Sequence, residues 1–180
     1  TTTERKRILL NNIYGVDIDS QAVEVTKLSL LLKVLEGETG ETLNQQMRLF
    51  HERALPDLGD NIKCGNSLID YRYLDNQQSL FMESEERNRV NMMEWSSVFP
   101  EVLKQGGFDA IIGNPPYIRI QTMKEWAPTD VNFYKKHYRT ADKGNYDIYV
   151  LFVEKGLKLL NKTGRLGYIL PHKCFNAQYG

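Results

Sequence analysis

The strongest constraint in this 180-residue sequence is a pair of consecutive prolines, Pro115 and Pro116, at the end of an apolar run. Residues 108–113, Phe-Asp-Ala-Ile-Ile-Gly, have the length and the β-branched content of a buried strand. Proline lacks the N–H that a sheet ladder needs and cannot enter a helix interior, so the strand must end there. The sequence therefore predicts a rigid loop that holds the Asn114 amide, the neighbouring backbone carbonyl and the Tyr117 ring in one geometry. The alternative is a proline-rich turn with an incidental tyrosine.

Strands and helices alternate along the rest of the chain. β-branched residues predict further strands at residues 12–18, 61–64 and 165–170. Helices are predicted at residues 1–10, 21–36, 43–54, 84–93 and 146–160. The helix at 21–36 has an apolar stripe at Val23, Leu28, Leu31, Leu32 and Leu35. This alternation is typical of an α/β fold with a parallel sheet covered by helices on both faces.

Two segments of the chain are long and polar. Residues 71–107 are predicted as a long insert that contains a loop and short helices. Residues 118–145 are predicted as a long loop with weak helical stretches, too long for a simple connector. Between Arg119 and Lys143 this loop holds six Lys or Arg residues against three acidic residues. The loop is therefore modestly positive, which suits nucleic acid but also suits an ordinary solvated surface.

Composition bounds the class of protein. With 41% hydrophobic residues, 26% charged residues and a net charge of zero, the chain suits one globular domain or part of one, without a chain-wide basic face. No apolar run approaches the length of a membrane span, and no signal-peptide pattern begins the sequence. Cys64 and Cys174 stand far apart, without metal-ligand spacing, and are predicted to be reduced, buried thiols in a cytoplasmic protein.

Polar side chains follow two other predicted strands, and ligands of open parallel sheets bind at such strand ends. Asp17 could accept hydrogen bonds from both hydroxyls of a ribose, and Ile18 beside it could lie against an adenine face. Asp17 could instead cap the following helix. Asn66, just past the strand at 61–64, could accept through its amide oxygen, or could simply form a turn.

The segment from Phe108 to Tyr117 resembles the catalytic motif of amino-methyltransferases that use S-adenosyl-L-methionine. More closely, it resembles the adenine-specific DNA methyltransferases of bacterial restriction–modification systems, in particular those fused with a nuclease in one polypeptide. The resemblance extends to residues 146–152, which are similar to the next motif of that family, and to residues 164–171, which are similar to its following strand. It implies a Rossmann-like class I methyltransferase fold.

The resemblance also implies roles for individual residues. Asn114 and the Pro115 carbonyl would accept from the target amine, and Pro116 would stiffen the loop. Tyr117 would stack on an extruded adenine, so its aromatic face should matter more than its hydroxyl. Asp17, Ile18, Asn66 and Asn114 would contact S-adenosyl-L-methionine, although most family members carry an acid at the position of Asn66.

The sequence departs from the family in one region. Residues 1–11 contain no glycine, whereas the family's glycine-rich cofactor loop and its first strand should precede Asp17. Residues 1–180 are therefore expected to be a partial, internal piece of the catalytic domain, with target-recognition and nuclease domains elsewhere in the polypeptide. Phe175 or Tyr179 is expected to provide the second aromatic side chain of the target pocket.

These expectations converge on methyl transfer from S-adenosyl-L-methionine to adenine flipped out of double-stranded DNA, without a membrane partner. Two alternatives remain at this stage. One is a methyltransferase that acts on a protein glutamine or on RNA, because the same loop suits any planar amide or amine. The other is a catalytically incomplete DNA-binding segment, which the missing glycine loop would suit.

Overall fold

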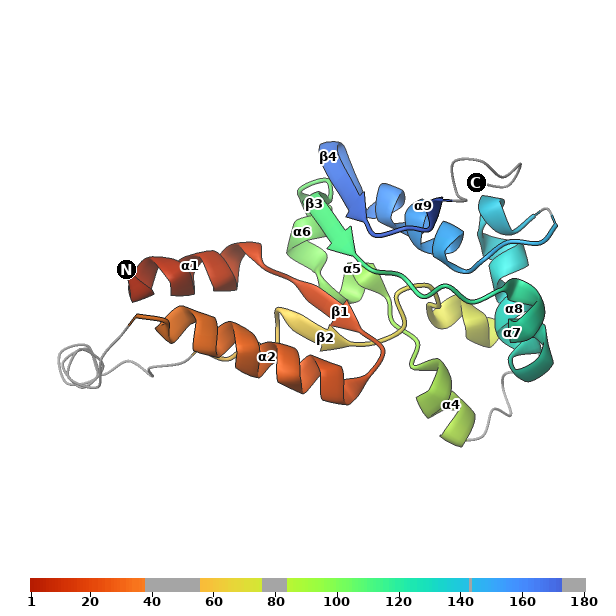
Figure 1. The fold of residues 1–180 in the computed structure, drawn as a ribbon, viewed down its shortest axis with the longest axis horizontal. Helices are drawn as coiled ribbons and strands as arrows, with labels where there is room; N and C mark the ends of the chain where they lie inside the picture. Colours follow the sequence, from red (N-terminus) through yellow and green to blue (C-terminus); the bar gives the residue numbers. More distant parts are fainter. Residues whose placement is uncertain (38–55, 76–83, 143, 173–180) are drawn as a thin grey trace. The chain divides into compact units, whose positions relative to one another are not determined.

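The computed structural model describes residues 1–37, 56–75, 84–142 and 144–172 (Figure 1). The chain divides into two compact units, Thr1–Asn66 and Ser67–Gly180. Each unit contains one pair of parallel strands, so the described strands form two separate two-stranded sheets. The observed architecture is a mixed α/β arrangement of short parallel strand pairs. The sequence predicted a mostly parallel sheet that lacks its first strand.

Among the described residues, the first unit contains two helices and one strand pair. Its elements are α1 (Thr2–Asn12), β1 (Gly15–Asp17), α2 (Ser20–Leu35) and β2 (Ile62–Cys64). β1 and β2 are parallel, with Asp17 opposite Cys64. Both strands were predicted, although β1 is shorter than residues 12–18. The helix predicted at residues 43–54 lies outside the described residues.

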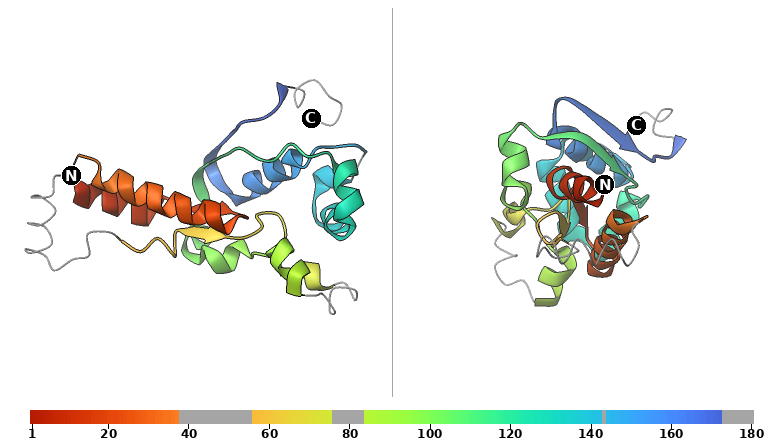
Figure 2. Two further views of the ribbon diagram at one scale, coloured as in Figure 1. Left: turned by 60° about the horizontal axis from the view of Figure 1, so that its bottom comes forward. Right: turned by 90° about the vertical axis from the view of Figure 1, so that its left-hand side faces the viewer.

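The core of the first unit forms where α1 and α2 lie side by side next to β2 (Figure 2). Its buried members are Leu9, Val23, Val34, Leu58 and Ile62. The apolar stripe predicted for α2 is only partly correct, because Leu28 and Leu32 are 57% and 59% exposed. The side of α2 that faces the core instead carries buried Val23 and Val34 and partly buried Leu30 and Leu31, which keeps the helical period.

The second unit contains the longer strand pair. β3 (Phe108–Gly113) and β4 (Leu160–Tyr168) are parallel, with Gly113 opposite Tyr168. Between them the chain forms α7 (Ile120–Trp126), α8 (Pro128–His137), the 3-10 turn Arg139–Ala141 and α9 (Tyr149–Leu159). The segment 118–145, predicted as a long loop, is thus largely helical. Ahead of β3 lie the 3-10 turn Tyr71–Asp75, α4 (Ser84–Val90), α5 (Trp95–Val98) and α6 (Pro100–Lys104).

Strand β3 is more exposed than the sequence predicted. Its apolar run suggested a fully buried strand, but Ile112 is 86% exposed and Ala110 is also exposed. β3 pairs with β4 along one edge, and among the described residues no strand pairs with its other edge. Its start is tightly packed, because a Cβ on Gly107 would lie 2.4 Å from the Leu159 carbonyl oxygen.

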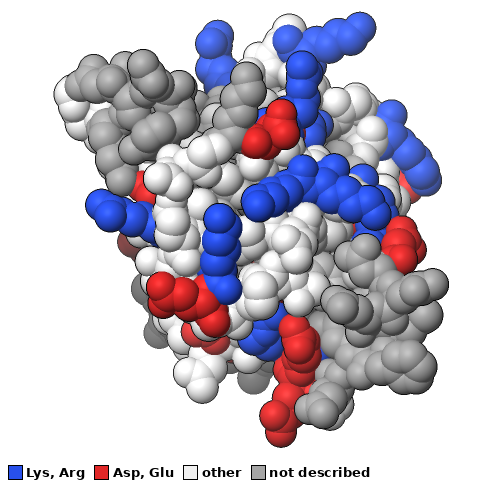
Figure 3. Space-filling model, turned by 90° about the vertical axis from the view of Figure 1, so that its right-hand side faces the viewer, with Lys and Arg blue, Asp and Glu red and all other residues white. Residues whose placement is uncertain are grey.

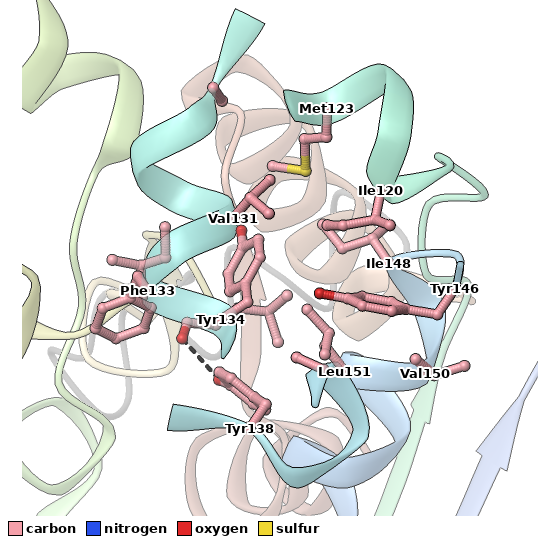
Figure 4. Packing of buried hydrophobic residues seen from close by; sticks show 14 of the residues in the cluster. Ile120, Met123, Val131, Phe133, Tyr134, Tyr138, Tyr146, Ile148, Val150 and Leu151 are labelled. Carbon is pink, nitrogen blue, oxygen red and sulfur yellow. Dashed lines mark hydrogen bonds between the residues drawn. The ribbon is translucent and has the colours of Figure 1, made fainter. Parts of the chain in front are cut away.

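The core of the second unit is built from aromatic side chains of α8 and α9 and of the turns around them (Figure 4). Tyr134 and Tyr146 point into the same interior, together with Val131, Ile148 and Leu151 (Figure 4). The Tyr138 hydroxyl donates to the Leu68 carbonyl at 2.6 Å and so ties this core to the start of the unit.

An ion pair between buried Asp130 and exposed Arg89 joins α8 to α4. Asp130 is 2% exposed, and it accepts hydrogen bonds from both terminal nitrogens of Arg89, at 2.9 and 3.0 Å. The Tyr73 hydroxyl donates to the same carboxylate at 2.7 Å. Asp130 therefore contributes no free negative charge to the surface of α8.

Three further expectations concern the cysteines, the aromatic residues near the end of the sequence and membrane-spanning helices. Cys64 is exposed, not buried as predicted, because β2 ends at this residue. Cys174, Phe175 and Tyr179 lie outside the described residues. Within the described ranges, no helix combines the length and the apolar character needed to span a membrane.

Candidate active site

The loop after β3 places three of its four predicted site residues at the surface. Pro115 is buried, whereas Asn114, Pro116 and Tyr117 are exposed. A proline ring fixes φ, and a buried ring also prevents the loop from moving as a whole. The Asn114 carboxamide and the Tyr117 ring are therefore presented to solvent from a backbone that is buried at Pro115.

The Tyr117 hydroxyl connects this loop to the end of the neighbouring strand. Its Oη lies 2.9 Å from Oδ1 of Asn114 and 2.7 Å from the backbone carbonyl oxygen of Ile169. The Ile169 N–H in turn donates to the Gly113 carbonyl at 3.1 Å. The loops that follow β3 and β4 are thus joined by a side chain and by the backbone. Sequence reasoning missed Ile169, because a backbone carbonyl can belong to any residue type and leaves no signature.

A second set of contacts supports Tyr117 from the side of α9. The Tyr117 and Tyr149 rings meet in a T-shaped arrangement, with centroids 6.1 Å apart and an interplanar angle of 82°.

The segment after the loop also pairs with the segment before α9. Arg119 forms an antiparallel bridge with Asp147. The backbone continues this pairing, since Ile120 N donates to the Tyr146 carbonyl at 2.9 Å and Ile148 N donates to the Ile118 carbonyl at 2.8 Å. Asp147 is itself buried, and Phe152 packs against the core.

Glu154 of α9 holds the turn behind these contacts. Its carboxylate accepts from the backbone N–H groups of Arg139 and Thr140, from the Thr140 hydroxyl and from Lys158. Burial acts to raise the pKa of Glu154, but the hydrogen bonds from Lys158, Thr140 and Arg139 outweigh it and lower this pKa to about 2. Glu154 therefore stays ionised and holds the turn throughout the neutral range.

The other predicted site residues lie together at the carboxyl end of the β1–β2 pair. Asp17 ends β1 and is exposed, and Ile18 is 54% exposed. The Gly65 N–H donates to the Asp17 carbonyl at 2.8 Å, which places half-buried Asn66 just beyond the same edge.

The structure distinguishes two possible roles of Asp17, as a helix cap or as an acceptor for a ligand. Asp19, not Asp17, caps α2, because its Oδ1 accepts from the Gln21 N–H at 2.8 Å. Asp17 uses Oδ1 to accept from the Asp19 N–H at 2.9 Å, and its Oδ2 accepts no hydrogen bond from the described residues. Asp17 therefore retains acceptor capacity toward a ligand. This group and the Asn114–Tyr117 loop lie in different units.

Positive charge gathers on the helical segment that follows the loop. Five basic residues of residues 119–142 are exposed there, against two exposed acidic residues, Glu125 and Asp142. The basic residues are Arg119, Lys124, Lys135, Lys136 and Arg139. The face shown in Figure 3 carries Lys and Arg side chains on largely uncharged surface, with several Asp and Glu side chains among them. The remaining acid of the segment, Asp130, is neutralised inside by Arg89.

Comparison with known proteins matches nearly the whole chain. Escherichia coli RM.Eco57I, a type II restriction enzyme and methyltransferase, is 36% identical over 176 residues, which is 98% of this chain and 16% of that protein. A putative type II restriction enzyme and methyltransferase of Methanocaldococcus jannaschii, RM.MjaORFECS2P, is 23% identical and covers 93% of this chain and 22% of its own length. The adenine-specific methyltransferase PglX of Streptomyces coelicolor is 24% identical over 98% of this chain and 14% of its own length.

The chain thus spans less than a quarter of the length of each of these three relatives. Residues 11–180 match the Eco57I restriction-modification methylase family, and this range includes both strand pairs and every predicted site residue. On this match the chain belongs to the Eco57I restriction-modification methylase family.

Proposed function

We propose that the full-length protein transfers a methyl group from S-adenosyl-L-methionine to the exocyclic amine of adenine in double-stranded DNA, as the modification activity of a restriction–modification enzyme. The observation that carries this proposal is the loop after β3, in which exposed Asn114 and Tyr117 stand on a frame fixed by Pro115 and Ile169. The names of the relatives support the reaction class, since RM.Eco57I is called a restriction enzyme and methyltransferase and PglX an adenine-specific methyltransferase.

The chemistry of the target explains why such a loop is needed. The exocyclic nitrogen of adenine is a poor nucleophile, because its lone pair is delocalised into the ring. Two acceptors, the Asn114 side-chain oxygen and the Pro115 carbonyl, would each take one N–H of the amine and draw the nitrogen toward tetrahedral geometry. The loop contributes positioning and electrostatic stabilisation, and no covalent intermediate on the protein is required.

The Tyr117 ring would bind the extruded base. An adenine inside a duplex cannot present its amine to a protein loop, so the base must leave the stack. Tyr117 is 48% exposed, and an aromatic ring provides a stacking surface for a base. The Tyr149 ring packed against Tyr117 limits how far the stacking surface can turn.

The β1–β2 edge fits the adenosine part of S-adenosyl-L-methionine, which supplies an electrophilic methyl group when bound. Asp17 has an exposed carboxylate with one oxygen available, which suits two ribose hydroxyls. Ile18 offers exposed apolar surface to an adenine face, and Asn66 lies at the same edge. The family resemblance also assigns a cofactor contact to Asn114.

The exposed basic residues of the segment 119–142 would contact the DNA backbone. Phosphate contacts from Lys and Arg orient a protein on DNA without reading sequence. Sequence reading and cleavage would belong to target-recognition and nuclease domains of the full-length polypeptide.

A methylation assay with three substrate classes tests the proposal. The full-length protein is incubated with methyl-labelled S-adenosyl-L-methionine and with plasmid DNA, total RNA or a protein extract, and methylated DNA is digested to nucleosides for mass spectrometry. We expect label in DNA, recovered as methyladenine, and none above background in RNA or protein. Label in RNA or in protein glutamine instead would contradict the proposal, as would methylcytosine as the DNA product.

A further inference from the structure

The Tyr117 hydroxyl has two neighbours that cannot both receive its hydrogen. Its Oη lies within hydrogen-bond distance of the Asn114 Oδ1, at 2.9 Å, and of the Ile169 carbonyl, at 2.7 Å. A tyrosine hydroxyl carries one hydrogen to donate and can accept through its lone pairs. One of the two contacts must therefore bring a donor to Oη if both are to be hydrogen bonds.

Only the asparagine can supply that donor. The Ile169 carbonyl belongs to the backbone, and its residue is held by the hydrogen bond from Ile169 N–H to the Gly113 carbonyl. The Asn114 carboxamide is exposed, and a half-turn about Cβ–Cγ exchanges Oδ1 for Nδ2 with little change of shape. After that turn, Nδ2 donates to Oη of Tyr117, and Oη donates to the Ile169 carbonyl.

We propose that the Tyr117 hydroxyl is a positioning group, which holds the Asn114 carboxamide with Nδ2 on Oη and directs Oδ1 toward the target amine. This inference rests on the proposed function, in which Oδ1 of Asn114 accepts from that amine. With Oη on Nδ2, both lone pairs of Oδ1 are free for the target. Donation from Nδ2 also increases the electron density on Oδ1 through amide conjugation, which makes Oδ1 a stronger acceptor.

This role is separable from stacking. The hydroxyl works at the edge of the ring, whereas a base would stack on a face, and the ring is 48% exposed while both hydroxyl contacts are made. Replacing Tyr117 by Phe therefore removes the positioning contact and keeps the stacking surface. Replacing it by Ala removes both.

A double-mutant cycle in the full-length protein tests the inference. Tyr117→Phe, Asn114→Ala and the double variant are compared in single-turnover methylation of a duplex that contains the target adenine, with protein and S-adenosyl-L-methionine saturating. We expect Tyr117→Phe to slow methyl transfer about fivefold, which is the size of one neutral hydrogen bond. In the Asn114→Ala background the same change should have no further effect, because the hydroxyl acts through the carboxamide.

Binding measurements separate positioning from a loss of structure. DNA affinity, and the fluorescence of 2-aminopurine placed at the target base, should be unchanged in Tyr117→Phe and reduced in Tyr117→Ala. Tyr71→Phe is the matched control, because Tyr71 is 57% exposed in the same unit and lies outside the candidate site, and it should methylate at the wild-type rate.

Two results would overturn the inference alone: a wild-type rate in Tyr117→Phe, or an equal slowing by Tyr117→Phe with and without Asn114. A wild-type protein that methylates no DNA would instead contradict the proposed function, and the positioning role would fall with it.

Discussion

The two strand ends that carry the candidate site are held in opposite ways. At the end of β1, Asp17 is fixed by a neighbour in the same turn, since the Asp19 N–H donates to its carboxylate. At the end of β3, Tyr117 contacts Ile169, which is 52 residues away in the chain, and Pro115 is buried beneath the loop. The Asp17 carboxylate is positioned by a local contact, although the Asp17 backbone pairs with Gly65 on the neighbouring strand. The Tyr117 side chain is positioned by a contact between distant segments.

This difference matches what each end would have to do. A carboxylate that receives two hydroxyls can adjust to them, so a local turn is sufficient. When an acceptor that orients an amine for attack is misplaced by about 1 Å, the reaction slows, so this acceptor needs a rigid support. The comparison therefore predicts that changes at the β3 end reduce the rate, whereas changes at the β1 end reduce cofactor affinity.

The largest effect is expected for Asn114→Ala. This change removes one of two acceptors for the target amine, which should cost about 3 kcal/mol of transition-state stabilisation, or about a hundredfold in rate. Single-turnover methylation measures the loss, and equilibrium dialysis of S-adenosyl-L-methionine should show a much smaller change in cofactor affinity. A variant that methylates DNA at the wild-type rate would refute the role of Asn114.

Asp17→Ala should instead reduce the affinity for S-adenosyl-L-methionine more than the rate of methyl transfer. Losing an ionised acceptor for ribose hydroxyls should weaken S-adenosyl-L-methionine by about 2 kcal/mol, or roughly thirtyfold in Kd. Calorimetric titration of the full-length protein measures this, and base extrusion should be unaffected.

The matched control for Asp17 is Asp19→Ala in the same turn. It removes the N-cap of α2, so it should cost about 1 kcal/mol in stability and leave the Kd nearly unchanged. Equal losses of cofactor affinity in both variants would mean that Asp17 acts only on the turn.

Gly107→Ala tests how strongly the frame around β3 depends on close backbone packing. Gly107 has a φ of +114°, and a Cβ there would meet the Leu159 carbonyl oxygen at 2.4 Å. Gly106→Ala is a matched control, because Gly106 has a φ of +103° but nothing within 4 Å of the added Cβ. We expect Gly107→Ala to lose about 1–3 kcal/mol more than Gly106→Ala in hydrogen-exchange protection of β3. Equal losses would show that the strand start can relax.

The smallest effect is expected for Glu154→Gln, which weakens the hydrogen bonds that hold the turn at Arg139 and Thr140. Because the folded-state pKa of Glu154 lies below its ordinary value, its ionised form stabilises the fold above about pH 4.5, and this stabilisation is lost as the pH falls toward about 2. We expect a loss of about 1 kcal/mol at pH 7 in exchange protection of the Arg139 and Thr140 amides.

The pH dependence provides the check on Glu154. The difference from wild type should shrink between pH 4.5 and 2, after correction for intrinsic exchange rates. Glu101→Gln is the control, since Glu101 forms an exposed ion pair with Lys104 and should change little at any pH. If the difference in exchange protection between the variant and the wild type persists unchanged at low pH, the charge of Glu154 does not stabilise the turn.

Part of this site could be predicted from local sequence signals. The two prolines after a β-branched run predict a strand that ends in a stiff loop, and a strand that ends in Asp17 predicts an exposed acid at a sheet edge. Residues 118–145 were predicted as a loop with only weak helical stretches, although Pro128 at the first position of α8 is a helix-start signal as well as a breaker. Their burial also depends on Tyr134 and Tyr138, whose amphipathic side chains give a weak periodic pattern.

The remaining misses concern contacts that no single residue type encodes. The exposure of Ile112 and Cys64 depends on which strands pair and where they end, and not on the hydrophobicity of either side chain. The Ile169 carbonyl enters the site through the register of β3 and β4.

The antiparallel pairing of residues 118–120 with residues 146–148 has a consequence for how this protein can diversify. The segment between Ile118 and Ile148 contains α7 and α8, and its two ends are joined because the Ile148 N–H donates to the Ile118 carbonyl. Lengthening such a segment costs little loop-closure entropy and need not displace Tyr117. The segment can therefore change in length and in its exposed basic residues, while the apolar side chains of α7 and α8 keep their packing in the core. This separation would let the proposed nucleic-acid surface evolve without changes to the proposed catalytic loop.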